Sequence, residues 1–367
     1  MRILFLSMEA FGGKGGIAQY NRDFLRALCA APEVSEVIAV PRRMPLPPET
    51  LPPKLTFVTG ALPNRIAYSK AVIKLLKENS RFEAIGCGHI KLLPLALLAT
   101  LITRAPLFLL IYGIDAWKPI NNPIIKYLLS KIDVIISISD ITKDRFIEWS
   151  HLIQKKYFIL PNAISPGDYG VGAKPHYLLE RYGLSDKTVL MTLGRLAPEE
   201  QYKGFDEILE LLPRLSRRIP RIAYLIVGDG GDRVRLEAKA QALGVGDRVV
   251  FAGFIPEAEK ADHYRLADAF VMPGRGEGFG FVFLEALACG IPVVGSKLDG
   301  SREALRGGSL GILVDPRRPD ELEAGILKAL QQPRGVIPPG LDYFSFNNFA
   351  ARCHAILRQM VHSRGAG

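Results

Sequence analysis

Two glutamates eight positions apart, Glu277 and Glu285, flank a glycine-rich turn and the start of an apolar segment. The apolar residues from Phe281 onward predict a helix that would hold Glu285 about one turn inside it and leave Glu277 on the preceding loop. Gly278 and Gly280 would let the backbone approach a ligand, and the free amides of the first helical turn attract negative charge. The two carboxylates would then reach different parts of one ligand, such as a sugar attached to a phosphate. The competing interpretation is a surface loop that enters a buried helix and carries two incidental glutamates.

Two cations stand near the end of another predicted strand, Thr188 to Leu193. Arg195 follows this strand, and Lys203 precedes a glycine at the start of the next helix. Cations at the carboxyl end of a sheet suit a bound diphosphate. A solvated surface pair would show the same two residues.

Glycines follow two further strands. In Val227-Gly-Asp-Gly230, Gly228 would let a nucleotide approach the backbone, and an ordinary strand-ending turn is the alternative. The loop Gly12 to Gly16 opens a helix predicted over Ile17 to Cys29, so its amides would face an anion. Neither loop matches the phosphate loop Gly-x-x-x-x-Gly-Lys-Ser/Thr or a clean dinucleotide motif Gly-x-Gly-x-x-Gly, and no convincing acidic ribose partner follows the second strand. A dehydrogenase is therefore disfavoured.

Short β-branched or leucine-rich runs alternate with helix-period segments throughout the 367 residues, which indicates parallel sheets covered by helices on both faces. The predicted strands of the first half are Ile3 to Ser7, Val37 to Val40, Leu55 to Val58, Ala84 to Cys87, Leu107 to Ile111, Val134 to Ile138 and Tyr157 to Leu160. Those of the second half are Thr188 to Leu193, Ala223 to Val227, Val249 to Ala252, Ala269 to Met272, Pro292 to Val294 and Gly311 to Val314. The α/β pattern predicts two doubly wound Rossmann-like domains that face each other across a ligand-binding cleft.

The domain boundaries follow from composition. Pro, Gly, Asn and Ser accumulate without periodicity near 161–174, and a proline-rich stretch over 331–341 precedes a last apolar helix from about Ser345 to Met360. We therefore predict a first domain over 1–165, a second over 166–344, and a C-terminal helical segment over 345–367 that packs back on the first domain.

Composition limits the cellular location. Hydrophobic residues make up 48% of the chain, and the four cysteines are far apart without zinc spacing, which indicates a globular protein in a reducing compartment. The first residues lack the features of a secretory signal. The apolar segment Leu92 to Tyr112 is interrupted by Arg104 and Pro106, where a helix would give way to a strand, so it is predicted as core. These features predict a cytoplasmic protein.

The net charge of +10 lies almost entirely in the first half. Residues 1–165 carry 21 Lys plus Arg against 12 Asp plus Glu, whereas the rest carries 26 against 25. Such a field suits an anionic membrane or an acidic acceptor. A predicted helix over Arg65 to Lys77 aligns its cations on one face, which would place the protein peripherally on the inner face of the membrane, unless that face is simply solvated. Nucleic acid is not expected, because the cations are scattered and no nucleic-acid motif is present.

Taken together, these segments resemble the family 4 retaining glycosyltransferases, which have the GT-B fold. The matches occur in order along nearly the whole chain, and they are specific in the second half and looser in the first. They are Gly15-Gly-Ile-Ala18, Gly194-Arg195-Leu196, Lys203-Gly204, Val227-Gly-Asp-Gly230, Gly253-Phe-Ile-Pro256, Glu277 to Glu285, and Gly290-Ile-Pro-Val-Val294.

The resemblance implies a role for each matching residue. Glu285 would hold the ribose of a sugar nucleotide, and Glu277 would hold the transferred sugar. Arg195 and Lys203 would bind the diphosphate and stabilise the charge that develops as it leaves. The remaining donor-binding positions would be Gly13, Gly15 and Gly16 from the opposite domain, Gly228, Ile255 near the base, and Gly278, Phe279 and Gly280.

Neither a metal nor a cofactor is expected. No Asp-x-Asp pair occurs in the chain, so fixed cations would supply the charge for the diphosphate. Retention would then proceed by front-face attack of the acceptor hydroxyl. Glu277 would alternatively act as a nucleophile, as in retaining glycosidases, but the sugar-binding role is preferred.

One segment departs from the family pattern. Many relatives carry a histidine before the glycine that follows the strand Leu107 to Ile111, where this chain has Tyr112-Gly113-Ile-Asp115. The contact of that histidine with the donor sugar would fall to Tyr112 or Asp115, or be missing. His89 is a further acceptor-side candidate, with a structural role at the strand end as the alternative.

The sequence thus predicts a retaining hexosyltransferase that moves a sugar from a UDP- or GDP-sugar to a hydroxyl of a glycan or lipid-linked acceptor, in glycan, polysaccharide or glycolipid synthesis. Uridine and guanosine donors fit equally. Two alternatives stay open: a non-catalytic nucleotide-sugar or nucleic-acid binding protein on the same fold, and a sugar-nucleotide epimerase, which is disfavoured because no acid/base pair is evident on the first domain.

Overall fold

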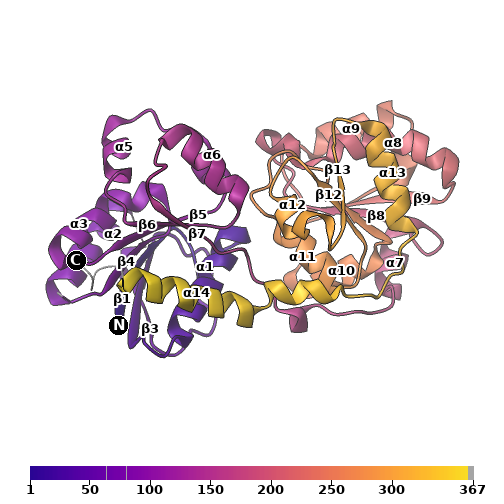
Figure 1. Ribbon diagram of the computed structural model, residues 1–367. Coiled ribbons are helices and arrows are strands. Elements are labelled where there is room, and N and C mark those ends of the chain that lie inside the picture. The colour runs from indigo at the N-terminus through magenta and orange to yellow at the C-terminus, as the bar shows by residue number, and fades with distance from the viewer. Residues whose placement is uncertain (63, 80, 363–367) are drawn as a thin grey trace. The chain divides into compact units, whose positions relative to one another are not determined.

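The structure is a computed structural model that describes residues 1–62, 64–79 and 81–362 (Figure 1). The chain forms two compact units. Unit 1 comprises Met1–Ala163 together with the last helix, and unit 2 comprises Ile164–Ser345. The backbone amide of Ile164 donates to the carbonyl of Phe344 at 2.8 Å, and Ile164 forms a β-bridge with Ser345, so both ends of unit 2 meet.

Unit 1 contains a parallel sheet of seven strands in the order β3-β2-β1-β4-β5-β6-β7. The strands are β1 (Arg2–Ser7), β2 (Glu36–Pro41), β3 (Leu55–Phe57), β4 (Ala84–Cys87), β5 (Leu107–Ile111), β6 (Val134–Ser137) and β7 (Lys156–Ile159). All seven predicted strands of the first half are confirmed, with ends that differ by about one residue. Inner strands such as β1, β5 and β6 are almost fully buried, which explains why unbroken apolar runs located them, whereas the edge strands β3 and β7 are only partly buried.

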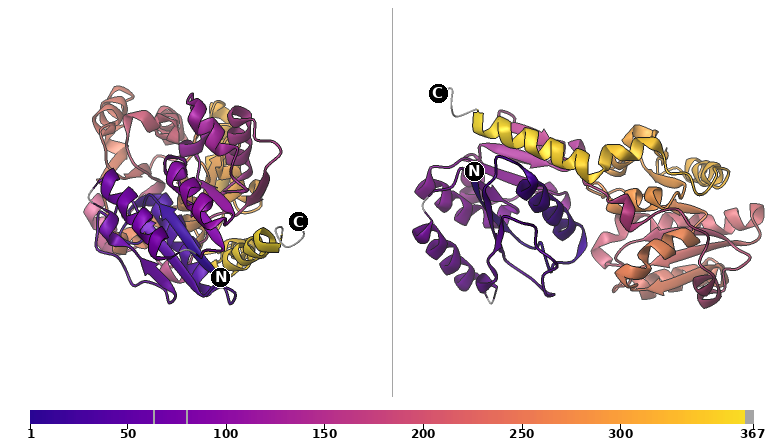
Figure 2. Two further views of the ribbon diagram at one scale, coloured as in Figure 1. Left: turned by 90° about the vertical axis from the view of Figure 1, so that its left-hand side faces the viewer. Right: turned by 90° about the horizontal axis from the view of Figure 1, so that it is seen from below.

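Helices cover both faces of this sheet. They are α1 (Gly15–Ala30), α2 (Arg65–Glu78), α3 (Leu93–Thr103), α4 (Ile114–Trp117), α5 (Pro123–Leu129), α6 (Asp140–Ser150) and α14 (Phe346–His362). Side chains of β1 alternate: Leu4 and Leu6 join the core under α2 and α3, whereas Phe5 packs on Phe24 of α1. Helix α14 runs alongside α1, and its His354 Nε2 lies 2.7 Å from the carbonyl of Ala27 (Figure 2).

The apolar segment from Leu92 to Tyr112 divides as expected. Helix α3 ends at Thr103, the next residue Arg104 adopts the left-handed conformation, and β5 follows after Pro106. Across the part of the chain that the structure describes, no helix combines the length and apolar character needed to span a bilayer.

Unit 2 contains a parallel sheet of six strands in the order β10-β9-β8-β11-β12-β13. The strands are β8 (Thr188–Leu193), β9 (Ile222–Val227), β10 (Val249–Gly253), β11 (Ala269–Val271), β12 (Val293–Ser296) and β13 (Ile312–Val314). The helices are α7 (His176–Tyr182), α8 (Phe205–Arg218), α9 (Arg233–Ala242), α10 (Lys260–Leu266), α11 (Phe281–Ala288), α12 (Ser301–Ala304) and α13 (Pro319–Leu330). Each strand predicted for the second half is present.

Short 3-10 helices connect these elements. They are η1 (Thr59–Ala61), η2 (Ile90–Leu92), η3 (Pro166–Asp168), η4 (Pro198–Lys203), η5 (Gly246–Arg248), η6 (Glu257–Glu259), η7 (Arg306–Gly308) and η8 (Pro339–Phe344). In unit 2, α8, α9 and α13 share one core, whereas Tyr264 of α10 and Phe283 of α11 pack on Phe270 of the sheet. Both faces of the second sheet are therefore covered, as in the first.

Candidate functional site

Four neighbouring strands of unit 2 bring the predicted donor-site residues to one sheet edge. The strands β10, β9, β8 and β11 are adjacent and parallel, so their carboxyl ends point the same way. Ile255 follows β10, Gly228 follows β9, Arg195 follows β8, and the loop that carries Glu277 follows β11. This is the edge at which open parallel sheets bind ligands.

Lys203 lies at the centre of this edge. Its mostly buried side chain crosses the end of β8, since a methyl group added to Gly194 would lie 3.5 Å from Nζ. The ammonium lies 3.2 Å from Oε2 of Glu200 and 3.7 Å from Oε1 of Glu277. The structure thus places the predicted diphosphate cation beside the predicted sugar-binding carboxylate.

Glu200 is a site residue that the sequence analysis missed. Its carboxylate accepts a hydrogen bond from Nε of Arg195 at 3.3 Å and a second from Nη2. Burial alone would raise the pKa of Glu200, but the hydrogen bond from Arg195 and the charge of Lys203 outweigh it and lower that pKa. Its spacing of three residues from Lys203 is the only local signal of this contact.

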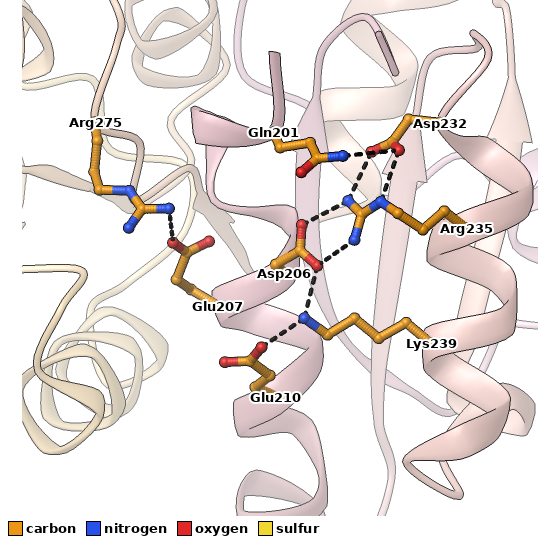
Figure 3. Close-up of polar contacts among 8 residues, drawn as sticks. All are labelled: Gln201, Asp206, Glu207, Glu210, Asp232, Arg235, Lys239 and Arg275. Carbon is orange, nitrogen blue, oxygen red and sulfur yellow. Dashed lines mark hydrogen bonds and ion pairs between the residues drawn. The ribbon is translucent and has the colours of Figure 1, made fainter. Parts of the chain in front are cut away.

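A network of ion pairs anchors η4, the turn that carries Glu200 and Lys203 (Figure 3). Gln201 Nε2 donates to Oδ1 of Asp232 at 3.4 Å, and Arg235 binds both Asp232 and Asp206 with contacts of 2.7 Å. Lys239 adds a 2.6 Å contact to Asp206. These side chains tie η4 to the first turns of α8 and α9, so the position of the turn is set by the rigid helices.

The loop before Glu277 is docked on the same turn. The amide of Arg275 donates to the carbonyl of Tyr202 at 2.8 Å, and Arg275 Nη2 lies 2.9 Å from Oε1 of Glu207 on α8 (Figure 3). The amide of Glu277 donates to Oδ2 of the buried Asp299 at 2.9 Å. The loop is therefore held to η4 on one side and to the segment before α12 on the other.

The surroundings of Glu277 raise its pKa. Burial raises the pKa of Glu277, the charge of Lys203 opposes this, and Asp299 and Glu200 raise it further, so that the pKa lies above its ordinary value. The carboxyl oxygens of Glu277 can accept hydrogen bonds from sugar hydroxyls.

Glu285 lies one turn inside α11, which begins at Phe281 as predicted. Its buried carboxylate accepts hydrogen bonds from Lys260 Nζ at 2.6 Å and from the hydroxyl of Tyr264 at 2.7 Å. Burial alone would lower the pKa of Lys260, but the negative charges of Glu285 and Glu257 outweigh this effect, so the pKa of Lys260 is raised. Both oxygens of Glu285 thus have partners that the sequence analysis missed. These partners, Lys260 and Tyr264, are four residues apart, which places them on one face of α10.

At two of the predicted donor-binding positions, the backbone geometry itself favours a glycine. Gly228 has φ +133°, and a methyl group there would lie 1.9 Å from the carbonyl oxygen of Gly194, because two strand-end turns cross at this point. Gly280 has φ +92° and is the N-cap residue of α11, where it offers no side chain to cap the amides of the first turn. Phe279 is buried, so the backbone of the segment Gly278 to Gly280 is the part suited to contact a ligand.

The first glycine loop lies in unit 1. Gly15, with φ +80°, begins α1, and Gly15 and Gly16 are exposed. Gly13 is buried, and a methyl group there would lie 2.8 Å from the side chain of Ala18. The helix start thus combines a tightly packed glycine with an open turn.

The acceptor-side candidates differ in their free hydrogen-bonding capacity. His89 Nδ1 accepts from the amide of Lys91 at 3.0 Å, and burial together with Lys91 and Arg43 lowers the pKa of His89 to about 4, which keeps it neutral. The hydroxyl of the buried Tyr112 donates to Asn21 at 2.7 Å. These contacts give both residues structural roles in unit 1.

Asp115 is different, because its buried Oδ2 has no hydrogen-bond partner among the residues that the structure describes. Burial raises the pKa of Asp115 to about 7, against opposing hydrogen bonds from nearby backbone groups. An unpartnered buried carboxylate oxygen is energetically costly.

Comparison with known proteins covers both units. The family model described as Glycosyltransferase Family 4 matches residues 14–167, and that described as Glycosyl transferases group 1 matches residues 180–337. The GDP-mannose-dependent alpha-(1-6)-phosphatidylinositol monomannoside mannosyltransferase of Mycolicibacterium smegmatis is 37% identical over 201 residues, which is 51% of this chain and 52% of that protein. Alpha-D-kanosaminyltransferase of Streptomyces kanamyceticus is 29% identical over 59% of this chain and 57% of its own. The chain thus matches about half the length of these curated relatives.

Solved structures match along nearly the full length. Sucrose-phosphate synthase from Thermosynechococcus elongatus superimposes with a TM-score of 0.76 at 20% identity, covering 99% of both chains. The Anabaena protein HepE in complex with UDP and glucose gives a TM-score of 0.74 at 20% identity, covering 98% of this chain and 100% of its own. These matches confirm the predicted GT-B fold class of two parallel Rossmann-like sheets. Because the two family models together account for most of both units, the chain belongs to glycosyltransferase family 4.

Proposed function

We propose that this protein is a metal-independent retaining hexosyltransferase that moves a sugar from a nucleotide-diphosphate donor to a hydroxyl acceptor. The observation that carries the proposal is the position of Lys203, whose ammonium lies beside both Glu277 and Glu200 at the carboxyl edge of the second sheet. A fixed cation at this edge suits a departing diphosphate, and the adjacent carboxyl suits the sugar attached to it.

The chemistry assigned to unit 2 is leaving-group stabilisation. As the bond between the sugar C1 and the phosphate oxygen breaks, negative charge grows on the diphosphate, and Lys203 and Arg195 stabilise it. The acceptor oxygen forms its bond to C1 on the face that the diphosphate leaves. Glu277 and the amides of Gly278 to Gly280 hold the sugar, and Glu285 holds the ribose.

A binding protein without activity is the competing hypothesis, and donor hydrolysis separates the two. We expect slow release of UDP or GDP from a sugar nucleotide in the absence of acceptor, because water can replace the acceptor hydroxyl. A thermal-shift screen with UDP, GDP, UDP-glucose and GDP-mannose identifies the donor first, since a ligand that binds only the native state raises its melting temperature. Binding of a donor without any hydrolysis would favour the binding protein.

Two nucleotides, UDP and GDP, have support as the carrier of the donor sugar. The HepE structure contains UDP, and the Mycolicibacterium relative is named for its dependence on GDP-mannose. We therefore propose a UDP- or GDP-sugar as the donor and a glycan or lipid-linked hydroxyl as the acceptor.

Unit 1 is proposed to bind the acceptor, with Asp115 as the residue that receives a hydroxyl. The support is the buried, unpartnered Oδ2 of Asp115, which lies in α4, the short helix that follows β5. His89 and Tyr112 follow or end neighbouring strands of the same sheet edge and would shape the site through their existing contacts.

Asp115→Asn is expected to remove a decline in stability between about pH 4 and pH 7. The pKa of Asp115 rises from 3.8 to about 7 on folding, so over this range the folded protein holds a proton that the unfolded chain has released. The free energy of unfolding of the wild type therefore falls as the pH rises, and the variant lacks this contribution. Urea unfolding at a series of pH values measures how the free energy of unfolding changes with pH in the wild type and in the variant. Identical slopes for the two proteins would contradict the raised pKa of Asp115.

Membrane association is proposed for one surface of unit 1. Helix α3 contacts both α2 and α5, and all three gather on one side of the sheet (Figure 1). Leu101 of α3 is 77% exposed and Ile124 of α5 is 66% exposed, and exposed cations lie on or directly after the same three helices. These cations are Arg65, Lys70, Lys74 and Lys77 of α2, Arg104 after α3, and Lys126 of α5. Apolar side chains among cations suit an anionic lipid surface, consistent with a cytoplasmic protein on the inner face of the membrane.

The double variant Leu101→Glu/Ile124→Glu is expected to abolish flotation with anionic vesicles. The wild type should float with vesicles that contain phosphatidylglycerol and stay behind with pure phosphatidylcholine, because charge and apolar insertion act together. Val234→Glu, at a residue of unit 2 that is 75% exposed, is the matched control and should float like the wild type. Equal flotation of the double variant would refute this surface.

A further inference from the structure

The two cations assigned to the diphosphate are already bound to one carboxylate. Glu200 accepts from Nε and Nη2 of Arg195 and lies 3.2 Å from Nζ of Lys203. A carboxylate that bridges a guanidinium and an ammonium makes the kind of contacts that a phosphate oxygen pair would make with them.

Glu200 is built into this position. Its side chain is only 10% exposed, and its backbone, with φ −113° and ψ 26°, interrupts the helical geometry of η4. The next residue, Gln201, is anchored on Asp232 of the ion-pair network (Figure 3). By contrast, the neighbouring Glu199 is exposed. The kink therefore turns one of two adjacent glutamates inward and leaves the other in solvent.

Two cations face two carboxyl groups in this cluster before any ligand binds. Arg195 and Lys203 face the carboxyl groups of Glu200 and Glu277, and a diphosphate adds at least two more negative charges. A diphosphate that binds both cations therefore competes with the contacts of Glu200. Arg195 can be reached from solvent, since its side chain is 69% exposed.

We propose that Glu200 takes the place of the diphosphate in the unliganded protein, where it positions Arg195 and Lys203 and competes with the nucleoside diphosphate product. This inference rests on the proposed function. Glu200 is a positioning residue, and its competition limits the affinity for the product, so that the product leaves after each turnover.

Glu200→Gln tests the competition directly, because it keeps the size of the side chain and removes its charge. We expect UDP or GDP, and also inorganic pyrophosphate, to bind about tenfold more tightly in calorimetric titrations, since both cations lose an anionic partner. The inhibition constant of the nucleoside diphosphate should fall by the same factor, and kcat should fall with it as product release slows. Glu199→Gln is the matched control and should stay within about twofold of the wild type.

The outcomes separate this inference from the proposed function. Weaker or unchanged binding of pyrophosphate by Glu200→Gln would overturn the role of Glu200, even if the wild type hydrolyses sugar nucleotides. A wild type that hydrolyses none would overturn the transferase, while pyrophosphate binding would still test Glu200. If Glu200→Gln does not fold, Glu200→Asp keeps the charge with a shorter reach. Because the shorter carboxylate cannot reach both cations, the pyrophosphate affinity of this variant should rise severalfold, and an affinity equal to that of the wild type would overturn the proposal.

Discussion

Lys203→Ala is expected to lower kcat for sugar transfer about a hundredfold to a thousandfold, with a much smaller change in KM. The ammonium lies next to Glu277 and Glu200 and is fixed across the end of β8, so its interaction with the diphosphate strengthens as the leaving group gains charge. An interaction that is stronger in the transition state than in the ground state affects kcat. Steady-state kinetics with the donor identified by thermal shift measure the effect.

Two further variants sharpen this result. Lys203→Arg should not restore activity. Cδ of Lys203 lies so close to Gly194 that a methyl group on this glycine would be only 3.4 Å away, and the wider guanidinium would not fit in the same place. Lys297→Ala removes an exposed lysine of the same unit that pairs with Glu321, and should keep normal turnover. A kcat of Lys203→Ala within about threefold of the wild type would refute the site.

Glu285→Gln is expected to weaken nucleotide binding and, at the same time, to lower the free energy of unfolding by about 3 kcal/mol. The stability effect follows from the contact of Glu285 with Lys260 at 2.6 Å, since the variant leaves a largely buried ammonium without its main anionic partner. Urea unfolding measures the stability, and titration with UDP and GDP measures the binding.

A double variant separates these two effects. Glu285→Gln with Lys260→Met removes both charges and should recover most of the lost stability, because an unpaired buried ion is no longer present. Nucleotide binding should stay weak if Glu285 contacts the ribose. Recovery of binding together with stability would show that Glu285 only supports the fold, and an unchanged unfolding midpoint in the single variant would exclude its structural role.

Local patterns in the sequence were sufficient to predict the strands and the helix that position the site. The inner strands are buried on both faces and therefore form continuous apolar runs, and the edge strands β3, β7, β10 and β13 were located as well although they are only partly buried. The glycines before Phe281 fixed the start of α11, and with it the separation of Glu277 on the loop from Glu285 on the helix. These features depend on residues that are close together in the sequence, so the spacing of residue types is enough to predict them.

The partners of the site residues could not be predicted in the same way. Glu200 lies at a kink in η4, where no helical or strand period holds, and its role emerges only once the kink turns it toward Arg195. Tyr112 is bound to Asn21, which lies 91 residues away in the chain. Such contacts depend on how whole elements pack, and spacing carries no information about them.

The joined ends of unit 2 have a practical consequence. Because Ile164 and Ser345 are paired by a β-bridge, the chain leaves this unit at the point where it entered, and 164–345 is an uninterrupted insertion in unit 1. The insertion can therefore be excised at these two residues without cutting a strand or helix, as a separate recombinant fragment for nucleotide titrations. Deleting the last helix instead would remove a piece of unit 1, and a fusion tag at the carboxyl terminus would be attached to that unit.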